Sequence, residues 1–308
     1  MSERKHRHPL RYDPDERFEV SIIGKILLFL GPFMAGILLF TVYPFINAFL
    51  MSFKENYSIL KDTFSGWGFA NYRKVLNDPI FLSGLKTTIK YVIIVVPISL
   101  VISIIIAVLL NNTKRFKAIL QTAYFMPLVT STAAISLVFR FIFANEGGLV
   151  NKIITSLGQS QINFLGTNKW SELVLYIFGI WNILPFTIIL LLAGLQNIDP
   201  QYYTAAKADG AKTLDIFTNI TVPLLSPTIA LVAIVNSISA FKIFDYVFQL
   251  YNKPGPGYNL YTIIYYIYEK FGGTKPQYGY AAAASIVLFF IIAVFTLLQR
   301  VLQRKTDY

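Results

Sequence analysis

The chain has 308 residues, of which 55% are hydrophobic and only 14% are charged. Ordinary soluble domains carry about 25% charged residues. A chain this apolar could not cover its surface in water, so a lipid bilayer is the expected solvent. The net charge of +11 would suggest nucleic acid as a partner of a soluble protein. Here the basic residues flank apolar stretches, where lipid headgroups account for them. The sequence contains no cysteine, which excludes disulfides and thiolate metal sites.

The first twenty residues form a polar tail, which we expect to lie in the cytosol. One transmembrane domain is expected to follow over residues 21–308. The tail has no apolar core of the kind that a secretory signal peptide requires. It holds both histidines, His6 and His8, and two imidazoles without further ligands predict no metal site.

Six stretches lack charged residues and are long enough to cross a bilayer, which takes about 20 apolar residues. Backbone groups in lipid must find their hydrogen-bond partners within the segment, so each stretch is predicted to be a helix. The fold class is therefore all-α, a polytopic membrane protein with six transmembrane helices. Prolines within several stretches predict kinks. The stretches cover residues 26–53, 91–110, 118–139, 173–198, 216–241 and 276–299.

An even number of spans places both termini on the same side of the membrane. The short loop over residues 111–117, NNTKRFK, is basic, and short loops rich in Lys and Arg lie on the cytoplasmic side. Both termini are therefore predicted to be cytosolic. Three long loops, 54–90, 145–170 and 249–275, are then predicted to lie outside.

The inner loop over residues 196–222 is expected to be more than a connector. Asp199 followed by Pro200 is typical of a helix start, with a capping side chain before proline at the first helical position. Three alanines then favour a helix with a small face. Gly210 predicts a sharp corner, and a second helical stretch leads towards Pro223. A small exposed helical face suits close docking by another protein, although a solvated connector is the alternative.

The run from Tyr203 to Ala211, with Ile220 and Pro223, resembles the EAA loop of ABC importer permeases. Thr204 stands where that family usually has glutamate, and Val222 replaces a leucine. Seven positions match the family pattern: Ala205, Ala206, Asp209, Gly210, Ala211, Ile220 and Pro223.

The resemblance extends along most of the chain. The segments are similar to permeases of the binding-protein-dependent carbohydrate and glycerol-phosphate type. They are WGFANY at 67–72, DPIF at 78–81, FMP at 125–127, AGLQNIDP at 193–200, FDYV at 244–247, PGPG at 254–257 and GYAA at 279–282.

This resemblance implies a permease subunit of a bacterial inner-membrane importer, not an enzyme. It implies a second, similar permease, two cytosolic ATPase subunits that each receive an EAA helix, and an outer solute-binding protein. The sequence has no G-x-x-x-x-G-K-[ST] phosphate loop. ATP and magnesium are therefore expected on the partner subunits, and this chain is expected to hold no cofactor. The resemblance assigns ATPase coupling to Tyr203, Thr204 and the seven matching positions.

Several polar residues in or near the spans are candidates for the substrate pathway. Amides can hydrogen-bond hydroxyl groups, although such groups most often join helices in membrane bundles. Lys242 and Asp245 lie three residues apart, a helical spacing that predicts an ion pair. The candidates are Trp181, Asn182, Asn236, Ser239, Lys242 and Asp245.

The favoured substrate is a carbohydrate, possibly an oligosaccharide, because amide and aromatic side chains outnumber charges in the spans. Glycerol phosphate is the alternative within the same family; it would favour a cationic pathway, for which only Arg140 and Lys242 are candidates. An ion-driven secondary transporter would need buried ionisable groups or an internal repeat, and it would leave the EAA-like loop unexplained.

Overall fold

The computed structural model describes residues 19–59, 61–112, 122, 126–251 and 253–304. Within these ranges the chain is helical apart from a short β-hairpin and connecting loops. The chain divides into two compact units, Met1–Met51 and Ser52–Tyr308, which are described in turn. The expected tail over residues 1–20 lies almost entirely outside the described residues and stays a prediction.

The first unit is a long helix with one widened turn. Helix α1, Glu19–Ile37, continues through a π-helical turn over Leu38–Val42 into α2, Tyr43–Phe53. The wide turn comes just before Pro44, whose ring clashes with the carbonyl four residues earlier in a regular helix. Residues Gly24–Phe53 are long and apolar enough to cross a membrane, which confirms the first predicted span.

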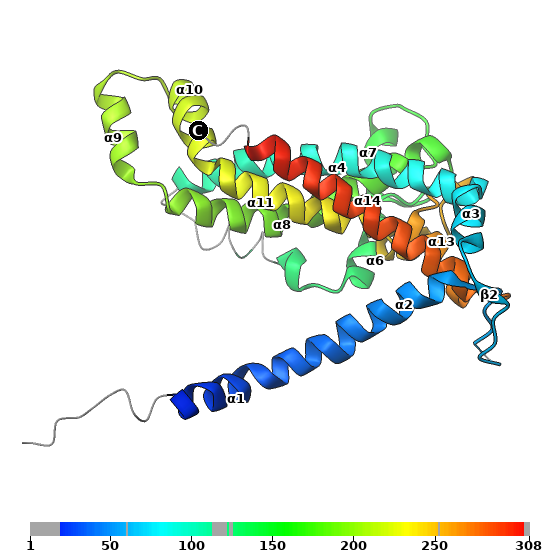
Figure 1. The fold of residues 1–308 in the computed structure, drawn as a ribbon. Helices are drawn as coiled ribbons and strands as arrows, with labels where there is room; N and C mark the ends of the chain where they lie inside the picture. Colours follow the sequence, from blue (N-terminus) through cyan, green and yellow to red (C-terminus); the bar gives the residue numbers. More distant parts are fainter. Residues whose placement is uncertain (1–18, 60, 113–121, 123–125, 252, 305–308) are drawn as a thin grey trace, which may run out of the picture. The chain divides into compact units, whose positions relative to one another are not determined.

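Four long helices form the body of the second unit. They lie side by side in Figure 1, with α4 packed against α8 and α11, and α11 packed against α14. Each is long and apolar enough to cross a membrane once α11 is extended back to Thr213. With the first unit, this confirms five of the six predicted spans. The helices are α4 Pro79–Asn112, α8 Asn168–Gln196, α11 Val222–Phe241 and α14 Tyr278–Arg304.

The third predicted span, 118–139, lies in part outside the described residues, which omit 113–121 and 123–125. Its described second half includes α6, Thr132–Ile142, a shorter apolar helix. Six spans therefore stay a prediction in this segment, while the all-α membrane fold is established by the rest.

Close packing of α4 on α8 depends on a small residue. A Cβ added at Gly179 would lie 2.0 Å from the hydroxyl of Tyr91, so a larger residue there would require the buried tyrosine ring to move. Small residues at helix contacts are the usual basis of packing in membranes, where the hydrophobic effect between helices is absent. Tyr91 and Phe178 belong to the larger of two buried clusters, and Leu191 and Leu225 belong to the smaller one, near α9.

The three predicted outer loops fold into small elements at one end of the second unit. Figure 1 shows α3, α7 and α13 at this end, opposite α9 and α10. The hairpin is antiparallel, with Lys54 opposite Trp67. The elements are β1 Lys54–Glu55, β2 Gly66–Trp67, α3 Ala70–Leu76, α7 Leu149–Ser156, α12 Asp245–Tyr251, a 3₁₀ turn Pro256–Tyr258 and α13 Ile263–Gly272.

Candidate functional site

Helix α9, Pro200–Ala208, begins where the sequence predicts. The side chain of Asp199 accepts a hydrogen bond of 2.8 Å from the backbone N–H of Gln201. Pro200 occupies the first helical position, where its missing N–H has no partner to lose. The helix start is thus fixed by two adjacent residues, independently of any tertiary contact.

The corner after α9 is a Schellman motif centred on Gly210. Gly210 has φ +78°. Its N–H donates to the carbonyl of Lys207 at 3.1 Å, and the N–H of Ala211 donates to the carbonyl of Ala206 at 2.9 Å. These bonds satisfy carbonyls that the helix end would leave unpaired. The positive φ confirms the predicted need for glycine at this corner.

The chain returns to the bundle through a second wide turn. Helix α10, Thr213–Ile216, starts with the N–H of Lys212 donating to the carboxylate of Asp215 at 3.2 Å. A π-helical segment, Phe217–Thr221, then leads into α11, where Pro223 cannot donate a backbone hydrogen bond. Proline again stands just beyond a π segment, as it does in the first unit.

Helix α9 presents most of its surface to solvent. Thr204, Ala205 and Asp209 are exposed, and Ala206 is half-buried. The hydroxyl of Thr204 donates to the carbonyl of Pro200 at 3.1 Å, so it is already engaged within its own helix. The exposed surface of α9 combines the small side chains of Thr204 and Ala205 with the larger Tyr202 and Lys207. The small side chains would permit close contact with another protein.

Tyr203 is the side chain of α9 that packs on the smaller buried cluster. Its hydroxyl lies 3.5 Å from that of Thr221, at the end of the π segment. A cavity of about 390 Å³ separates α9 from the bundle; its lining includes Asn111, Lys207 and Phe217. Among the described residues, Tyr203 is thus the α9 side chain that packs on a buried cluster of the bundle, in addition to the two chain connections of the helix.

Two of the pathway candidates are hydrogen-bonded between elements. Asn236 is buried, and its amide donates to the hydroxyl of Thr187 at 2.9 Å, joining α11 to α8. Asn182 accepts a bond of 2.7 Å from the hydroxyl of Tyr246, joining α8 to α12. These bonds agree with the role of joining helices, which the sequence leaves open.

Trp181 and Ser239 differ in how exposed their side chains are. Trp181 is half-buried, with its ring 5.4 Å from that of Phe139 on α6. Ser239 is exposed near the end of α11. The structure therefore does not gather all the candidates around one cavity among the described residues.

The predicted ion pair between Lys242 and Asp245 is wrong. Helix α11 ends at Phe241, and Asp245 is the first residue of α12, so the helical spacing that would bring the side chains together is absent. Both side chains are exposed. The Lys90–Glu172 contact is the salt bridge found among the described residues.

Sequence reasoning missed that Lys90–Glu172 pair, which joins α4 to α8. The hydroxyl of Tyr176 lies 3.4 Å from the same carboxylate. Each charge stands immediately before a charge-free stretch, Lys90 before residues 91–110 and Glu172 before residues 173–198. Both spans are predicted to start on the same side of the membrane, so the two opposite charges are expected at the same membrane surface. This shared position could have suggested the pair.

Tyrosines outside the spans hold α13 in place. The hydroxyl of Tyr266 donates to Asp78 at 2.8 Å, and that of Tyr261 donates to Glu269. Burial, and then the bond to a carboxylate, raises the pKa of Tyr266 and of Tyr261 above the ordinary 10.0. Both tyrosines therefore stay protonated at neutral pH and keep donating.

Residues 99–308 match the family described as binding-protein-dependent transport system inner membrane component. The chain is 33% identical over 273 residues to the arabinooligosaccharides transport system permease protein AraP of Bacillus subtilis (strain 168), covering 88% of this chain and 86% of the relative. It is 32% identical over 276 residues to the lactose transport system permease protein LacF of Rhizobium radiobacter, covering 88% and 91%.

Among solved structures, the chain is similar to one in the crystal structure of a bacterial alginate ABC transporter in complex with an alginate pentasaccharide-bound periplasmic protein. The TM-score is 0.80 at 23% identity, covering 95% of this chain and 99% of that chain. This likeness confirms the fold. Together with the sequence matches, it leads to one conclusion: the chain belongs to the family of binding-protein-dependent transport system inner membrane components, the membrane-spanning permeases of ABC transporters.

Proposed function

We propose that this chain is a permease subunit that imports a carbohydrate. The observation that carries this proposal is the set of relatives, which are named for arabinooligosaccharides, lactose, and trehalose and maltose. The relatives resemble this chain over most of its length, not only in the inner loop. A neutral polyhydroxylated solute also fits spans whose polar groups are mainly amides and hydroxyls.

Helix α9 is proposed to dock into a cytosolic ATPase subunit. Its start is capped and its end is closed by a Schellman motif, so the helix is well defined at both ends. Its exposed alanines present short side chains to a partner. The coupling residues are Tyr203, Thr204, Ala205, Ala206, Asp209, Gly210, Ala211, Ile220 and Pro223. ATP and magnesium are proposed to bind the partner ATPases and not this chain.

The remaining partners are a second, similar permease and an outer solute-binding protein. The alginate transporter was crystallised in complex with a periplasmic protein, which supports a partner of this kind. Both termini are proposed to be cytosolic in a bacterial inner membrane. Asn112, the exposed last residue of α4, tests this orientation in a chain without cysteine. Labelling of Asn112→Cys by an impermeant maleimide added outside intact cells would contradict it.

For the substrate pathway, Ser239, Lys242 and Asp245 are the stronger candidates because their side chains are exposed. Asn236 is the weakest, since its amide is already bonded to α8. Trp181 and Asn182 are half-buried and stay candidates. Lys242 is exposed and forms no salt bridge with the described residues, and this observation keeps glycerol phosphate as a second candidate substrate.

The proposal is tested with the assembled transporter in proteoliposomes. ATP hydrolysis and uptake are measured with the binding protein and a panel of arabinooligosaccharides, lactose, maltose, trehalose and glycerol phosphate. Stimulation by a sugar supports carbohydrate import. Stimulation by glycerol phosphate alone would select the second candidate, and no stimulation by any member would reject both.

A further inference from the structure

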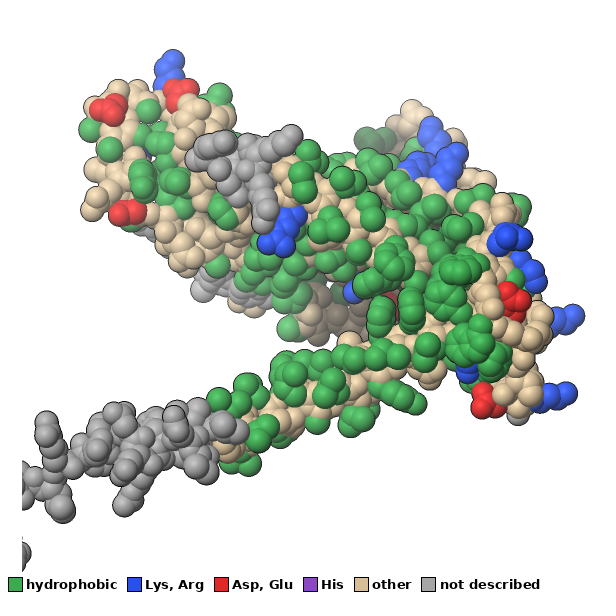
Figure 2. Space-filling view, in the orientation of Figure 1, with side chains coloured by type: hydrophobic (Ala, Val, Ile, Leu, Met, Phe, Trp, Pro, Cys, Tyr) green, Lys and Arg blue, Asp and Glu red, His purple; other side chains and the backbone are tan. Residues whose placement is uncertain are grey.

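An apolar groove runs along the outside of the second unit, between α4 and α14. It has a volume of about 560 Å³. Several of the side chains that line it are more than half exposed, among them Ile93 at 60% and Val294 at 55%. Figure 2 shows hydrophobic side chains over α14, with basic side chains gathered at the end of the unit where α3 lies. Others in the lining are Ile89, Val287, Phe290 and Leu298.

Helix α3 lies at one end of this groove and is amphipathic. Tyr72 and Leu76, one turn apart, line the groove. Arg73 and Lys74, between them in sequence, are exposed. The ammonium of Lys74 donates to the hydroxyl of Tyr280 at 2.7 Å, where α3 packs on the first turn of α14. Two exposed basic side chains of α3 therefore lie near this end of the groove, although neither of them lines it.

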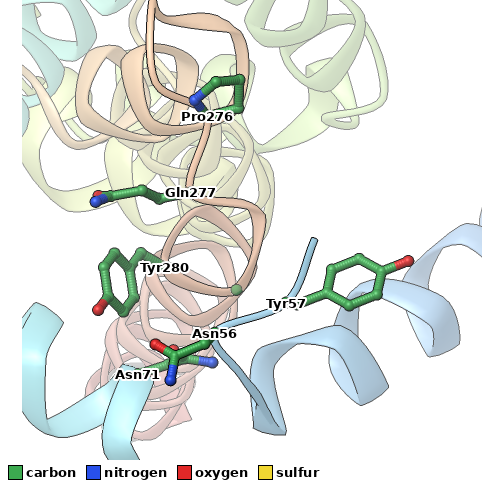
Figure 3. A pocket seen from close by; sticks show the side chains of 7 residues that line it. Asn56, Tyr57, Asn71, Pro276, Gln277 and Tyr280 are labelled. Carbon is green, nitrogen blue, oxygen red and sulfur yellow. The ribbon is translucent and has the colours of Figure 1, made fainter. Parts of the chain in front are cut away.

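A small polar pocket adjoins the same two helices. It has a volume of about 210 Å³, and Figure 3 shows the amides of Asn56, Asn71 and Gln277 around it, with the ring of Tyr280. Tyr280 lies seven residues before Val287, which is about 10 Å along α14. The charge-free stretch that contains α14 begins at Pro276, so the pocket lies at the level where this helix enters the membrane.

We propose that a phospholipid with an anionic headgroup occupies these sites together. Its acyl chain lies in the groove, its phosphate lies beside Lys74 and Arg73, and its headgroup hydroxyls reach the amides of the pocket. An apolar slot along membrane-crossing helices, with cations and hydrogen-bonding amides at its membrane-surface end, matches the amphipathic layout of a lipid. A packed transmembrane helix would fill the slot but would not account for the two exposed basic side chains and the amide-lined pocket near its end.

The first experiment tests whether the groove holds the lipid. The complete transporter is placed in phosphatidylcholine nanodiscs containing phosphatidylglycerol, extracted in mild detergent, and examined by native mass spectrometry. Val294→Trp fills the groove, because Val294 lines it. Leu297→Trp is the matched control: it lies on the same helix and is 61% exposed, but it does not line the groove. We expect phosphatidylglycerol to remain on the wild type and on Leu297→Trp, and to be lost from Val294→Trp.

The second experiment tests the headgroup site without changing the groove. A basic side chain near an anionic membrane surface is worth about fivefold in binding. Lys74→Gln is therefore expected to lower the ratio of bound phosphatidylglycerol to phosphatidylcholine about fivefold, while Lys74→Arg keeps it. An unchanged ratio in Lys74→Gln would overturn the anionic headgroup.

Two results would overturn the groove proposal. One is equal retention of phosphatidylglycerol by Val294→Trp and Leu297→Trp. The other is efficient disulfide formation between Val294→Cys and a cysteine placed in a transmembrane helix, either in the second permease or at Phe33 of this chain, because a helix would then occupy the groove. Absence of that cross-link, with lipid loss from Val294→Trp alone, supports the lipid.

Discussion

Replacing Gly210 by valine is expected to perturb the corner after α9 mainly through the backbone conformation. The residue has φ +78°, and an added Cβ would meet no other atom within 4 Å. A clash of the added Cβ therefore does not contribute. The left-handed conformation costs an L-residue roughly 1–2 kcal/mol, and it is a genuine outlier for a β-branched residue.

A cost of about 1.4 kcal/mol lowers the equilibrium constant for forming the native corner about tenfold. The expected order of damage is valine first, then alanine, with asparagine the mildest, because asparagine visits the left-handed region most readily after glycine. In each variant the six predicted spans should insert normally, since the corner lies outside them. Substrate-stimulated ATP hydrolysis and uptake should fall together in Gly210→Val.

Gly158 supplies the matched control for this experiment. It also has φ +78° with no atom within 4 Å of an added Cβ, but it follows α7 at the opposite end of the unit. Gly158→Val should carry the same backbone cost and leave coupling intact. The assays are membrane level, co-purification of the ATPase, and stimulated hydrolysis in proteoliposomes. Normal coupling in Gly210→Val, or equal loss in both variants, would refute the reasoning.

Three smaller effects are expected elsewhere. Thr204→Ala removes a hydroxyl that bonds only to its own helix, so coupling should change less than twofold, as hydrolysis assays would show. Asn236→Ala should lower stability by about 0.6 kcal/mol, because Thr187 keeps a second bond to its own helix; a loss of transport at normal thermal stability would instead indicate substrate contact. Glu172→Gln should cost at most about 1 kcal/mol in a melting assay, since Lys90 is half exposed.

The spans were predictable because each depends on a local property. A stretch without charge must be helical in lipid, so five spans follow from residue order alone. The start and end of α9 were predictable for a similar reason. Asp199 with Pro200 fixes the first turn, and Gly210 fixes the corner, without help from distant residues.

Contacts between distant segments were not predictable from local patterns. The Lys90–Glu172 pair depends on α4 and α8 lying side by side, and their charges are 82 residues apart. The failed Lys242–Asp245 pair shows the converse error. A spacing of three predicts a contact only if one helix continues through both residues, and here the helix ends at Phe241.

The inner loop carries two physically different links to the bundle. One is the non-covalent packing of Tyr203 on the smaller buried cluster, and this link is lost if α9 moves away from the cluster. The other is the covalent path from Gly210 through α10 and the π segment into α11. Between these two links, a cavity of about 390 Å³ separates α9 from the described part of the bundle. If α9 is displaced by a docked ATPase, we therefore expect it to act on α11 mainly through the chain itself, and we predict that the conformation of Gly210 matters more for coupling than the side chain of Thr204.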